Sequence, residues 1–259
     1  WTVKEVLYRQ QSDYQMVEIV DLIEMGRALV LDGVVQVTVK DEFVYNEMIT
    51  HVPLFTHPAP ERVLIIGGGD GGAAREVAKH TTVKQVDMCE IDSKVIESCR
   101  EYLPEMSVSY NHPKVNLIIK DGVKFIKDHP NTYDVIVIDS PDPIGPAVEL
   151  FGADFYQNVH RALKDDGLFV CQSESVYYHQ EIIKRINVAL KELFPITRVY
   201  TATTPSYPGF LWAYTIASKK YDPYDRMNAE KQEVQTRYYN HGIYKACFAL
   251  PTFLKEVLE

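Results

Sequence analysis

The chain has 259 residues, of which 46% are hydrophobic and 24% charged, an ordinary composition for a globular protein of one large or two small domains. Its formal net charge of −9 argues against a nucleic-acid partner, because proteins that bind nucleic acids carry a basic surface. With no long apolar stretch and no signal-peptide pattern, we expect no membrane span and a cytoplasmic protein. The four cysteines lack a CxxC spacing, which favours free thiols in a reducing compartment.

The N-terminal part of the chain predicts a small β domain followed by a helix. Residues 1–45 contain loosely alternating apolar segments, and Asp32-Gly33 between two of them is a strong hairpin signal. A helix is expected at 41–55, since apolar residues recur there at helical spacing: Val44, Met48, Val52 and Phe55. The sequence THPAP indicates a boundary near residue 59, so we expect domains at 1–58 and 59–259.

The rest of the chain alternates between strands that are apolar throughout and helices. We expect strands at 62–68, 85–92, 115–122, 133–140, 168–175, 196–203 and 210–219, and helices at 72–80, 92–102, 122–128, 152–164 and 178–193. Such alternation predicts an α/β fold with a parallel sheet covered on both faces. Ligands of these sheets bind outside the carboxyl ends of the strands. Acidic residues follow four of these strand ends, at Gly67–Gly72, Glu90/Asp92, Asp121/Gly122 and Asp139–Pro143.

The turn at 67–72 reads GGGDGG, and it follows a strand and opens a helix as a nucleotide-binding turn does. Its glycines, Gly67 and Gly69 among them, allow a ligand to approach the backbone closely. The carboxylate of Asp70 would repel a phosphate in this turn but would attract a cation. We therefore expect a positively charged ligand here, the alternative being a turn that contains glycine for its conformation alone.

Two further strand ends carry acids with nucleoside-binding spacing. Glu90 lies 18 residues after Gly72, where an acid commonly accepts hydrogen bonds from ribose hydroxyls; the alternative is a solvated acid. Asp92 is expected to cap the following helix. Asp121-Gly122 ends the third strand, where an acid can accept from an adenine amino group, although Asp-Gly is also a common turn.

Residues 138–147 hold Asp139 and Asp142 in a loop stiffened by three prolines. In one cleft with Asp70, these carboxylates would be costly unless a positive group lay among them. The alternative is a capped turn in which Pro143 presets Asp142. Because the sequence shows no cysteine–histidine cluster and no calcium loop, we expect no metal. A nucleoside with a cationic tail, together with a polyamine, would fit such a cleft.

Ordered motifs along nearly the whole chain resemble the polyamine aminopropyltransferase family, and within it the spermidine synthases. They are YQ at 14–15, LDGVVQ at 31–36, DEFVYNEMITHVPLF at 41–55, GGGDGG at 67–72, EID at 90–92, DG at 121–122, DSPDPIGPA at 139–147, CQSES at 171–175, PSYP at 205–208 and KACFALP at 245–251. The resemblance implies a methyltransferase-like Rossmann domain with a mostly parallel seven-stranded sheet, a small N-terminal β domain, and a homodimer or homotetramer. It implies transfer of an aminopropyl group from decarboxylated S-adenosylmethionine to putrescine, giving spermidine and methylthioadenosine, with no metal or other cofactor.

The resemblance also implies roles for individual residues. Asp70 and Asp139 would hold the donor's ammonium group or the amine being alkylated, and Tyr45 and Asp139 would position and deprotonate the attacking nitrogen. That nitrogen needs a base, because an alkyl ammonium group has a pKa of about 10.4 and only the neutral amine attacks. The donor would be bound by Gln36, Asn46, Gly67, Gly69, Asp70, Glu90, Asp121, Gly122 and Pro146. The acceptor tunnel would be lined by Gln15, Asp142, Gln172 and Tyr207.

Four positions depart from the family pattern near the donor tail and the acceptor tunnel: Asn46, Ser140–Pro143, Val176-Tyr177 and Gly209-Phe210. They leave open S-adenosylmethionine itself as the donor of a carboxyaminopropyl group, and agmatine or cadaverine as the acceptor. Two other classes of function also compete. A methyltransferase would give no reason for the acids at 70, 139 and 142, and a non-catalytic binding protein would be expected to lack Tyr45 or Asp139, which are both present.

Overall fold

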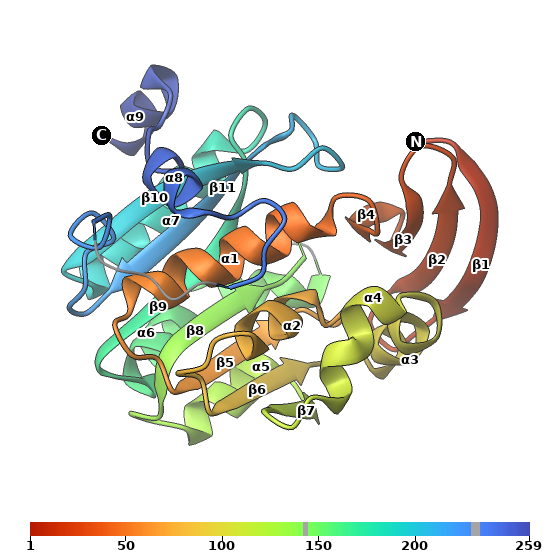
Figure 1. Cartoon of the computed structure of the whole chain (residues 1–259), viewed down its shortest axis with the longest axis horizontal. Helices are drawn as coiled ribbons and strands as arrows, with labels where there is room; N and C mark the ends of the chain where they lie inside the picture. Colours follow the sequence, from red (N-terminus) through yellow and green to blue (C-terminus); the bar gives the residue numbers. More distant parts are fainter. Residues whose placement is uncertain (142–144, 229–233) are drawn as a thin grey trace.

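The structure, a computed structural model, describes residues 1–141, 145–228 and 234–259. It contains two β-sheets, and Figure 1 shows the smaller, N-terminal sheet beside one end of the larger sheet and its helices. No helix in the described ranges is long and apolar enough to span a membrane.

The small sheet is antiparallel throughout. Its strands, in spatial and chain order, are β1 (Val3–Gln11), β2 (Met16–Leu22), β3 (Gly26–Leu31) and β4 (Val34–Thr38). The predicted hairpin joins β3 to β4, where Leu31 pairs with Val34. Asp32 and Gly33 both have positive φ angles, of 48° and 83°, as a two-residue turn of type I′ requires. The prediction of an N-terminal β region is confirmed.

Helix α1 (Glu42–Thr56) connects the two sheets and is buried along almost its whole length. Its apolar side chains, with Met48, Ile49 and Val52 fully buried, belong to the same core cluster as one face of the larger sheet. Helix α1 therefore packs as part of the larger sheet's core. A domain boundary at residue 58 stays a prediction.

The larger sheet has seven strands, as predicted. Their spatial order is β10 (Ile196–Thr203), β11 (Leu211–Ser218), β9 (Leu163–Ser175), β8 (Tyr133–Asp139), β5 (Arg62–Gly67), β6 (Gln85–Glu90) and β7 (Val115–Ile119). Strand β11 pairs antiparallel with both β10 and β9, and the other neighbouring strands pair in parallel. The central strands are apolar throughout because both of their faces are buried, as for Val63 and Leu64, which contribute to opposite core clusters.

Helices cover both faces of this sheet. Helices α1, α2 (Gly72–Ala78) and α8 (His241–Ala246) pack on one face, and α5 (Gly122–Phe125), α6 (Ala153–Ala162) and α7 (Gln180–Leu193) on the other. Helices α3 (Ser93–Tyr102) and α4 (Pro104–Ser107) pack against the small sheet. Helix α9 (Thr252–Leu258) packs on α7. Three 3-10 turns, at Val108–Asn111, Ile126–Asp128 and Gly145–Phe151, complete the description.

The helices expected at 41–55, 72–80, 92–102, 122–128, 152–164 and 178–193 are present, but the sequence did not predict α4, α8 and α9. Each has only four to seven residues, too few for a helical repeat of apolar positions to stand out. The helix expected at 122–128 is a single α-helical turn followed by a 3-10 turn.

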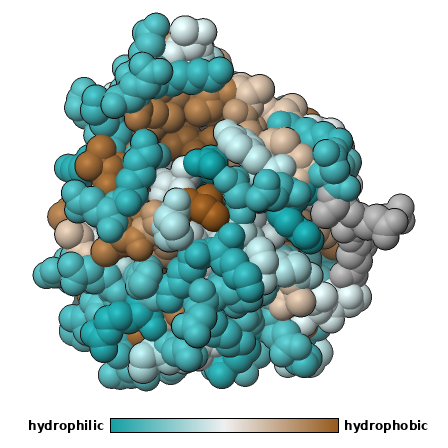
Figure 2. All heavy atoms as spheres, turned by 90° about the vertical axis from the view of Figure 1, so that its left-hand side faces the viewer, coloured by the Kyte–Doolittle hydropathy of each residue, from teal (hydrophilic) through white to brown (hydrophobic). Residues whose placement is uncertain are grey.

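The surface differs between the two ends of the molecule. Figure 2 shows the face on the side away from the small sheet, which is mostly hydrophilic, with apolar side chains gathered in its upper part. At the other end, the small sheet and the residues beside its strands carry several large apolar side chains that are about half exposed or more: Trp1, Val3, Val6 and Ile23.

Candidate active site

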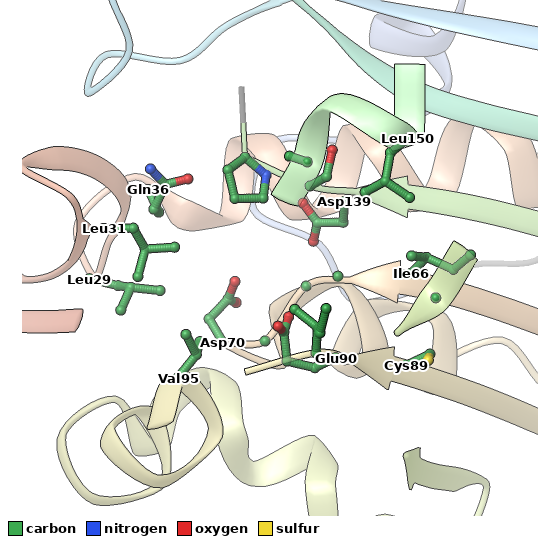
Figure 3. Close-up of a pocket in the computed structure, with 18 of the residues that line it drawn as sticks. Leu29, Leu31, Gln36, Ile66, Asp70, Cys89, Glu90, Val95, Asp139 and Leu150 are labelled. Carbon is green, nitrogen blue, oxygen red and sulfur yellow. The ribbon is translucent and has the colours of Figure 1, made fainter. Parts of the chain in front are cut away.

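A pocket lies where β5, β6 and β8 end, between the larger sheet and the small sheet. Figure 3 shows Asp70, Glu90 and Asp139 close together in it. Leu29, Leu31 and Gln36 of the small sheet lie on one side, and Ile66 and Cys89 of the larger sheet lie on the other. Of the predicted site residues, the pocket is lined by Gln15, Gln36, Tyr45, Asn46, Gly67, Gly69, Asp70, Glu90, Asp121, Gly122, Asp139 and Tyr207.

The glycine turn after β5 brings the backbone close to two of these acids. The backbone N–H of Gly68 donates to the carbonyl oxygen of Asp139 at 2.7 Å, and Gly67 has a φ angle of 82°. A Cβ atom on Gly69 would lie 2.8 Å from Oε2 of Glu90. Larger residues would therefore strain the turn or push Glu90 out of place.

Asp70 occupies the middle of this turn. Its Oδ1 accepts the backbone N–H of Gly72 at 2.7 Å. Burial and the nearby charge of Asp139 raise the pKa of Asp70 well above its usual value, although the Gly72 hydrogen bond lowers it. Such a carboxyl group would ionise fully when a cation binds beside it.

Asp139 ends β8 and faces Tyr45 of α1. Its Oδ2 is buried, and no group in the described ranges hydrogen-bonds to it. Burial raises the pKa of Asp139, while interaction with the Tyr45 hydroxyl lowers it. Burial and the charge of Asp139 raise the pKa of Tyr45 well above its usual value, so this hydroxyl remains protonated and can donate. An unpartnered carboxylate oxygen beside such a donor is a candidate proton acceptor.

Glu90 is the last residue of β6, and Asp92 lies two residues beyond it, at the start of α3. Oε1 of Glu90 accepts the backbone N–H of Asp92 at 2.9 Å. Burial raises the pKa of Glu90 to about 7. Asp92 caps α3 by accepting the backbone N–H of Lys94 at 3.0 Å, which confirms the expected cap.

Asp121 caps α5 with one carboxylate oxygen, which accepts the backbone N–H of Val123 at 2.9 Å. Its other oxygen lies 3.2 Å from the Lys124 ammonium group. The residue therefore has the turn role that was its structural alternative, and it also lines the pocket with Gly122. Its role toward adenine stays a prediction.

Two further polar side chains of the pocket, Tyr207 and Asn46, form hydrogen bonds within the protein. The Tyr207 hydroxyl donates to the backbone carbonyl of Gln36 at 2.7 Å, which joins the 204–210 loop to β4. Asn46 is almost fully buried, and its Nδ2 donates to Glu42 Oε2 at 2.8 Å.

Of the predicted residues whose side chains the structure describes, Gln172 alone does not line the pocket. Gln172 is buried on β9, and its Nε2 donates to the backbone carbonyl of Ser140, a pocket residue, at 3.4 Å. Asp142 lies outside the described residues. Pro146 lies in the 3-10 turn at Gly145–Phe151, one residue before Ala147, which lines the pocket.

Sequence reasoning missed Glu174, although it lies in the CQSES motif. This carboxylate is fully buried; its Oε1 lies 3.5 Å from Gln172 Nε2 and its Oε2 lies 3.0 Å from His179 Nδ1. Its φ angle of 79° is rare for any residue but glycine, and such strain is typical of functional sites. The only signal in the sequence was an acid within the CQSES motif, because the burial of Glu174 is visible only in the fold. The apolar walls, Leu29, Leu31 and Val95 among them, were also missed, because they depend on how the sheets meet.

One group of three potential metal ligands lies away from this pocket, at the other end of β8. It consists of His57, Asp134 and Asp166. Both oxygens of Asp134 are occupied, one by the Lys164 ammonium at 2.8 Å and the other by the backbone N–H groups of Glu61 and Arg62. The group therefore gives no support to a metal site, and the expectation of metal-free chemistry stays a prediction.

Comparisons with known proteins agree with this geometry. A family model described as "Spermine/spermidine synthase domain" matches residues 42–228, and one described as "Spermidine synthase tetramerisation domain" matches residues 1–39. The polyamine aminopropyltransferase of Clostridium kluyveri is 49% identical over 99% of this chain and 94% of its own. That of Moorella thermoacetica is 49% identical over 99% and 91%.

Two solved structures of spermidine synthases are also similar to this chain. A spermidine synthase in complex with the transition-state analogue AdoDATO has a TM-score of 0.93 and 41% identity, covering 99% of this chain and 89% of its own. The spermidine synthase from Thermotoga maritima has a TM-score of 0.91 and 41% identity, covering 99% and 88%.

Proposed function

The chain belongs to the spermine/spermidine synthase family and is an aminopropyltransferase of polyamine biosynthesis, and from this premise we propose its substrates and the roles of its residues. We propose that the donor is decarboxylated S-adenosylmethionine, that the acceptor is putrescine, and that the products are spermidine and methylthioadenosine. The observation that carries this proposal is the group formed by Asp70, Glu90 and Asp139 in the pocket, none of which forms a salt bridge with a described residue.

The acids favour a donor that carries only positive charges on its reacting side. Burial raises the pKa values of Asp70 and Asp139, and an ammonium or sulfonium group among them would relieve this cost. The carboxylate of S-adenosylmethionine would meet them as a like charge, and two such charges about 4 Å apart repel by about 4 kcal/mol near a protein surface. This repulsion supports the decarboxylated donor.

Asn46 supports the same conclusion. This residue was one of the four departures that left S-adenosylmethionine open as the donor, since a short side chain here could leave room for a donor carboxylate. Instead, Asn46 packs against Gly72, and its amide is held by the carboxylate of Glu42. The nearby guanidinium of Arg75 is already bound by Glu42 and Glu76, so it gives a donor carboxylate no ready partner.

The nucleoside of the donor would lie along the ends of β5 and β6. Glu90 would accept from the ribose hydroxyls, and Asp121 would accept from the adenine amino group through the oxygen not used for the helix cap. Leu29, Ile66 and Val95 provide apolar walls for the rings. Gln36, Gly67, Gly69, Gly122 and Pro146 complete the proposed donor site.

The transfer is a direct displacement. The neutral nitrogen of the acceptor forms a bond to the aminopropyl carbon next to sulfur; the carbon–sulfur bond breaks, and its electron pair goes to sulfur, which leaves as the neutral thioether of methylthioadenosine. The proton lost by the attacking nitrogen goes to Asp139, whose Oδ2 is unpartnered within the described part of the chain. Tyr45 orients Asp139 and the amine, and holding the reactants in line supplies much of the acceleration.

The acceptor would extend from Asp139 toward β9 and the 204–210 loop. Tyr207 and Gln172 lie along this direction, and Asp142 is a further proposed contact. We add Glu174 as an acid for the remote ammonium group, because it is buried one hydrogen bond beyond Gln172. A diamine with two cationic ends suits acids at both ends of such a path.

We propose a homodimer or homotetramer that works in the cytoplasm. The match of residues 1–39 to a tetramerisation domain supports assembly through the small sheet, whose exposed Val3, Val6 and Ile23 would then be covered. The four cysteines are free and buried, which supports a reducing compartment.

One mass-spectrometric assay tests the substrates. The purified protein is given decarboxylated S-adenosylmethionine or S-adenosylmethionine, each with putrescine, agmatine or cadaverine. We expect spermidine from the decarboxylated donor with putrescine, and turnover of S-adenosylmethionine lower by about a hundredfold or more. A carboxylated product from S-adenosylmethionine would overturn the donor, and faster turnover of agmatine or cadaverine would overturn the acceptor.

The Asp70→Asn variant tests the cation site in the same assay. Loss of one charged hydrogen bond to the donor predicts a rise in donor KM of about 10- to 100-fold. Asp154→Asn is the matched control, because it removes the same charge from the exposed side of α6. An unchanged donor KM in Asp70→Asn would count against the cation site.

A further inference from the structure

Asp92 lies at the point where the small sheet meets the end of β6 beside the pocket. It is almost fully buried, with a relative exposure of 1%. As the cap of α3 it needs only one carboxylate oxygen, Oδ1, which accepts the backbone N–H of Lys94. The other oxygen is therefore available for a second task.

That second oxygen binds the turn between β1 and β2. Oδ2 accepts the hydroxyl of Ser12 at 2.7 Å and the amide Nε2 of Gln15 at 3.1 Å. The backbone N–H of Asp92 in turn donates to Oε1 of Glu90 at 2.9 Å. One residue thus holds two pocket side chains, Gln15 from the small sheet and Glu90 from the larger sheet.

These contacts fix the direction of the Gln15 amide. Because one N–H of its Nε2 donates to Asp92, the amide is oriented with its carbonyl oxygen on the side away from Asp92, and a carbonyl oxygen only accepts hydrogen bonds. Glu90 presents acceptor oxygens as well. The two side chains therefore offer acceptors to a ligand that brings donors, as the two hydroxyl groups of a ribose do.

We propose that Asp92 is a positioning residue for the donor nucleoside, which holds the Gln15 amide and the Glu90 carboxylate as a pair of acceptors for the ribose hydroxyls. The inference rests on the proposed function, and it places Gln15 at the nucleoside instead of the acceptor tunnel. Asp92 acts through these residues and does not touch the reacting atoms.

A purely structural role for Asp92 makes a different prediction. The two regions are also joined by an apolar contact that does not involve Asp92, in which Val17, Ile19 and Leu29 of the small sheet pack on Val95 and Cys99 of α3. Asparagine caps helices about as well as aspartate. Asp92→Asn should therefore leave the fold and the cap in place while it puts a donor amide opposite Gln15.

The experiment measures binding of methylthioadenosine by calorimetry, together with the KM values of donor and acceptor. In Asp92→Asn, the Gln15 amide must turn over to accept from the new donor, so its nitrogen faces the ribose. We expect the Kd for methylthioadenosine and the KM for the donor to rise about tenfold, with acceptor KM and kcat nearly unchanged.

The double variant Asp92→Asn/Gln15→Glu restores the pairing with its polarity reversed. The introduced amide donates to one oxygen of the introduced carboxylate, and the other oxygen faces the ribose as an acceptor. We expect the double variant to recover most of the nucleoside affinity. Gln15→Glu alone places two carboxylates side by side and should bind more weakly than the double variant.

Asn240→Ala is the control for loss of a helix cap, because Asn240 caps α8, a helix that does not line the pocket, through the backbone N–H of Ile243. It should lower thermal stability without changing the Kd for methylthioadenosine. Unchanged nucleoside affinity in Asp92→Asn, or a double variant no better than Asp92→Asn, would overturn the positioning role. If the wild-type protein neither binds methylthioadenosine nor uses the decarboxylated donor, the proposed function itself fails.

Discussion

The pocket acids Asp70, Glu90 and Asp139 and the acids between α1 and α2 are all largely shielded from solvent, but in the described part of the chain only the second group has cationic partners. Glu76 is fully buried, and burial alone would raise its pKa; hydrogen bonds from His51 and Lys79 lower it to about 2. Arg75 bridges Glu76 and Glu42 at 2.8 Å each. In the pocket, by contrast, burial raises the pKa values of Asp70, Asp139 and Glu90.

The difference shows which buried acids serve the fold and which serve a ligand. A buried carboxylate is costly unless a cation or several hydrogen-bond donors compensate it. Between α1 and α2 the chain supplies its own cations, so this group joins two helices. In the pocket the compensation must come from outside, and the proposed donor and acceptor both bring positive charge.

Removing Asp139, the proposed base, should have the largest effect on turnover. Asp139→Asn keeps the shape of the side chain but cannot accept the proton, so we expect kcat to fall by about a thousandfold or more. The same change removes a buried, uncompensated carboxylate, so the midpoint of chemical unfolding near neutral pH should stay the same or rise. Stopped assays of spermidine formation and urea unfolding measure the two effects. Near-normal turnover would remove Asp139 from the role of base.

Removing the compensated acid should have the opposite pattern. Glu76→Gln removes the buried carboxylate that pairs with Lys79 and Arg75 and leaves Arg75 with Glu42 alone, and breaking such a pair costs about 3–5 kcal/mol of the free energy of unfolding. Glu97→Gln is the matched control, since Glu97 pairs with Lys94 in an exposed i,i+3 contact worth about 0.5 kcal/mol or less. If urea unfolding showed equal losses for the two variants, the proposed contrast between compensated and uncompensated acids would be wrong. Turnover of the folded fraction should persist in both.

The sequence was sufficient for one of these regions but not for the other. The pocket acids follow strands of one parallel sheet, and the carboxyl ends of parallel strands meet at one edge, so spacing alone brought Asp70, Glu90 and Asp139 together. No local pattern connects Glu76 to His51, which lies 25 residues earlier in the chain and meets it only when α1 packs on α2. Compensation of a buried charge is a tertiary property, which single-chain periodicity does not encode.

The same limit explains what was missed in the pocket itself. The glycine turn and the hairpin at Asp32-Gly33 depend on local backbone conformation, and both were predicted. The apolar wall from Leu29 and Leu31 depends on how the small sheet docks, and the second partner of Asp92 is Ser12, 80 residues away. Glu174 has a left-handed backbone conformation, which a glutamate in a sequence does not indicate.

The smallest expected effect is on the pH dependence of the free energy of unfolding, which should differ between the pocket acids and the acids between α1 and α2. Because the folded pKa values of Asp70, Asp139 and Glu90 are raised, the folded state binds more protons than the unfolded state between about pH 4 and 7. Their contribution to the free energy of unfolding therefore falls as pH rises through this window. Glu76, with its lowered pKa, acts in the opposite sense and only at lower pH, where its stabilisation is lost as the pH falls toward about 2.

The double variant Asp70→Asn/Asp139→Asn isolates the pocket's share of this slope. Between about pH 5 and 8 we expect the wild-type protein to lose about 1–2 kcal/mol relative to the variant, a value below the full shift because water reaches the pocket. Urea unfolding of both proteins across this range measures the difference. Parallel pH curves would mean that the pocket carboxyls ionise as easily in the folded chain as in the unfolded one. In that case the chain would already compensate them, and the acids would no longer indicate a site for a cationic ligand.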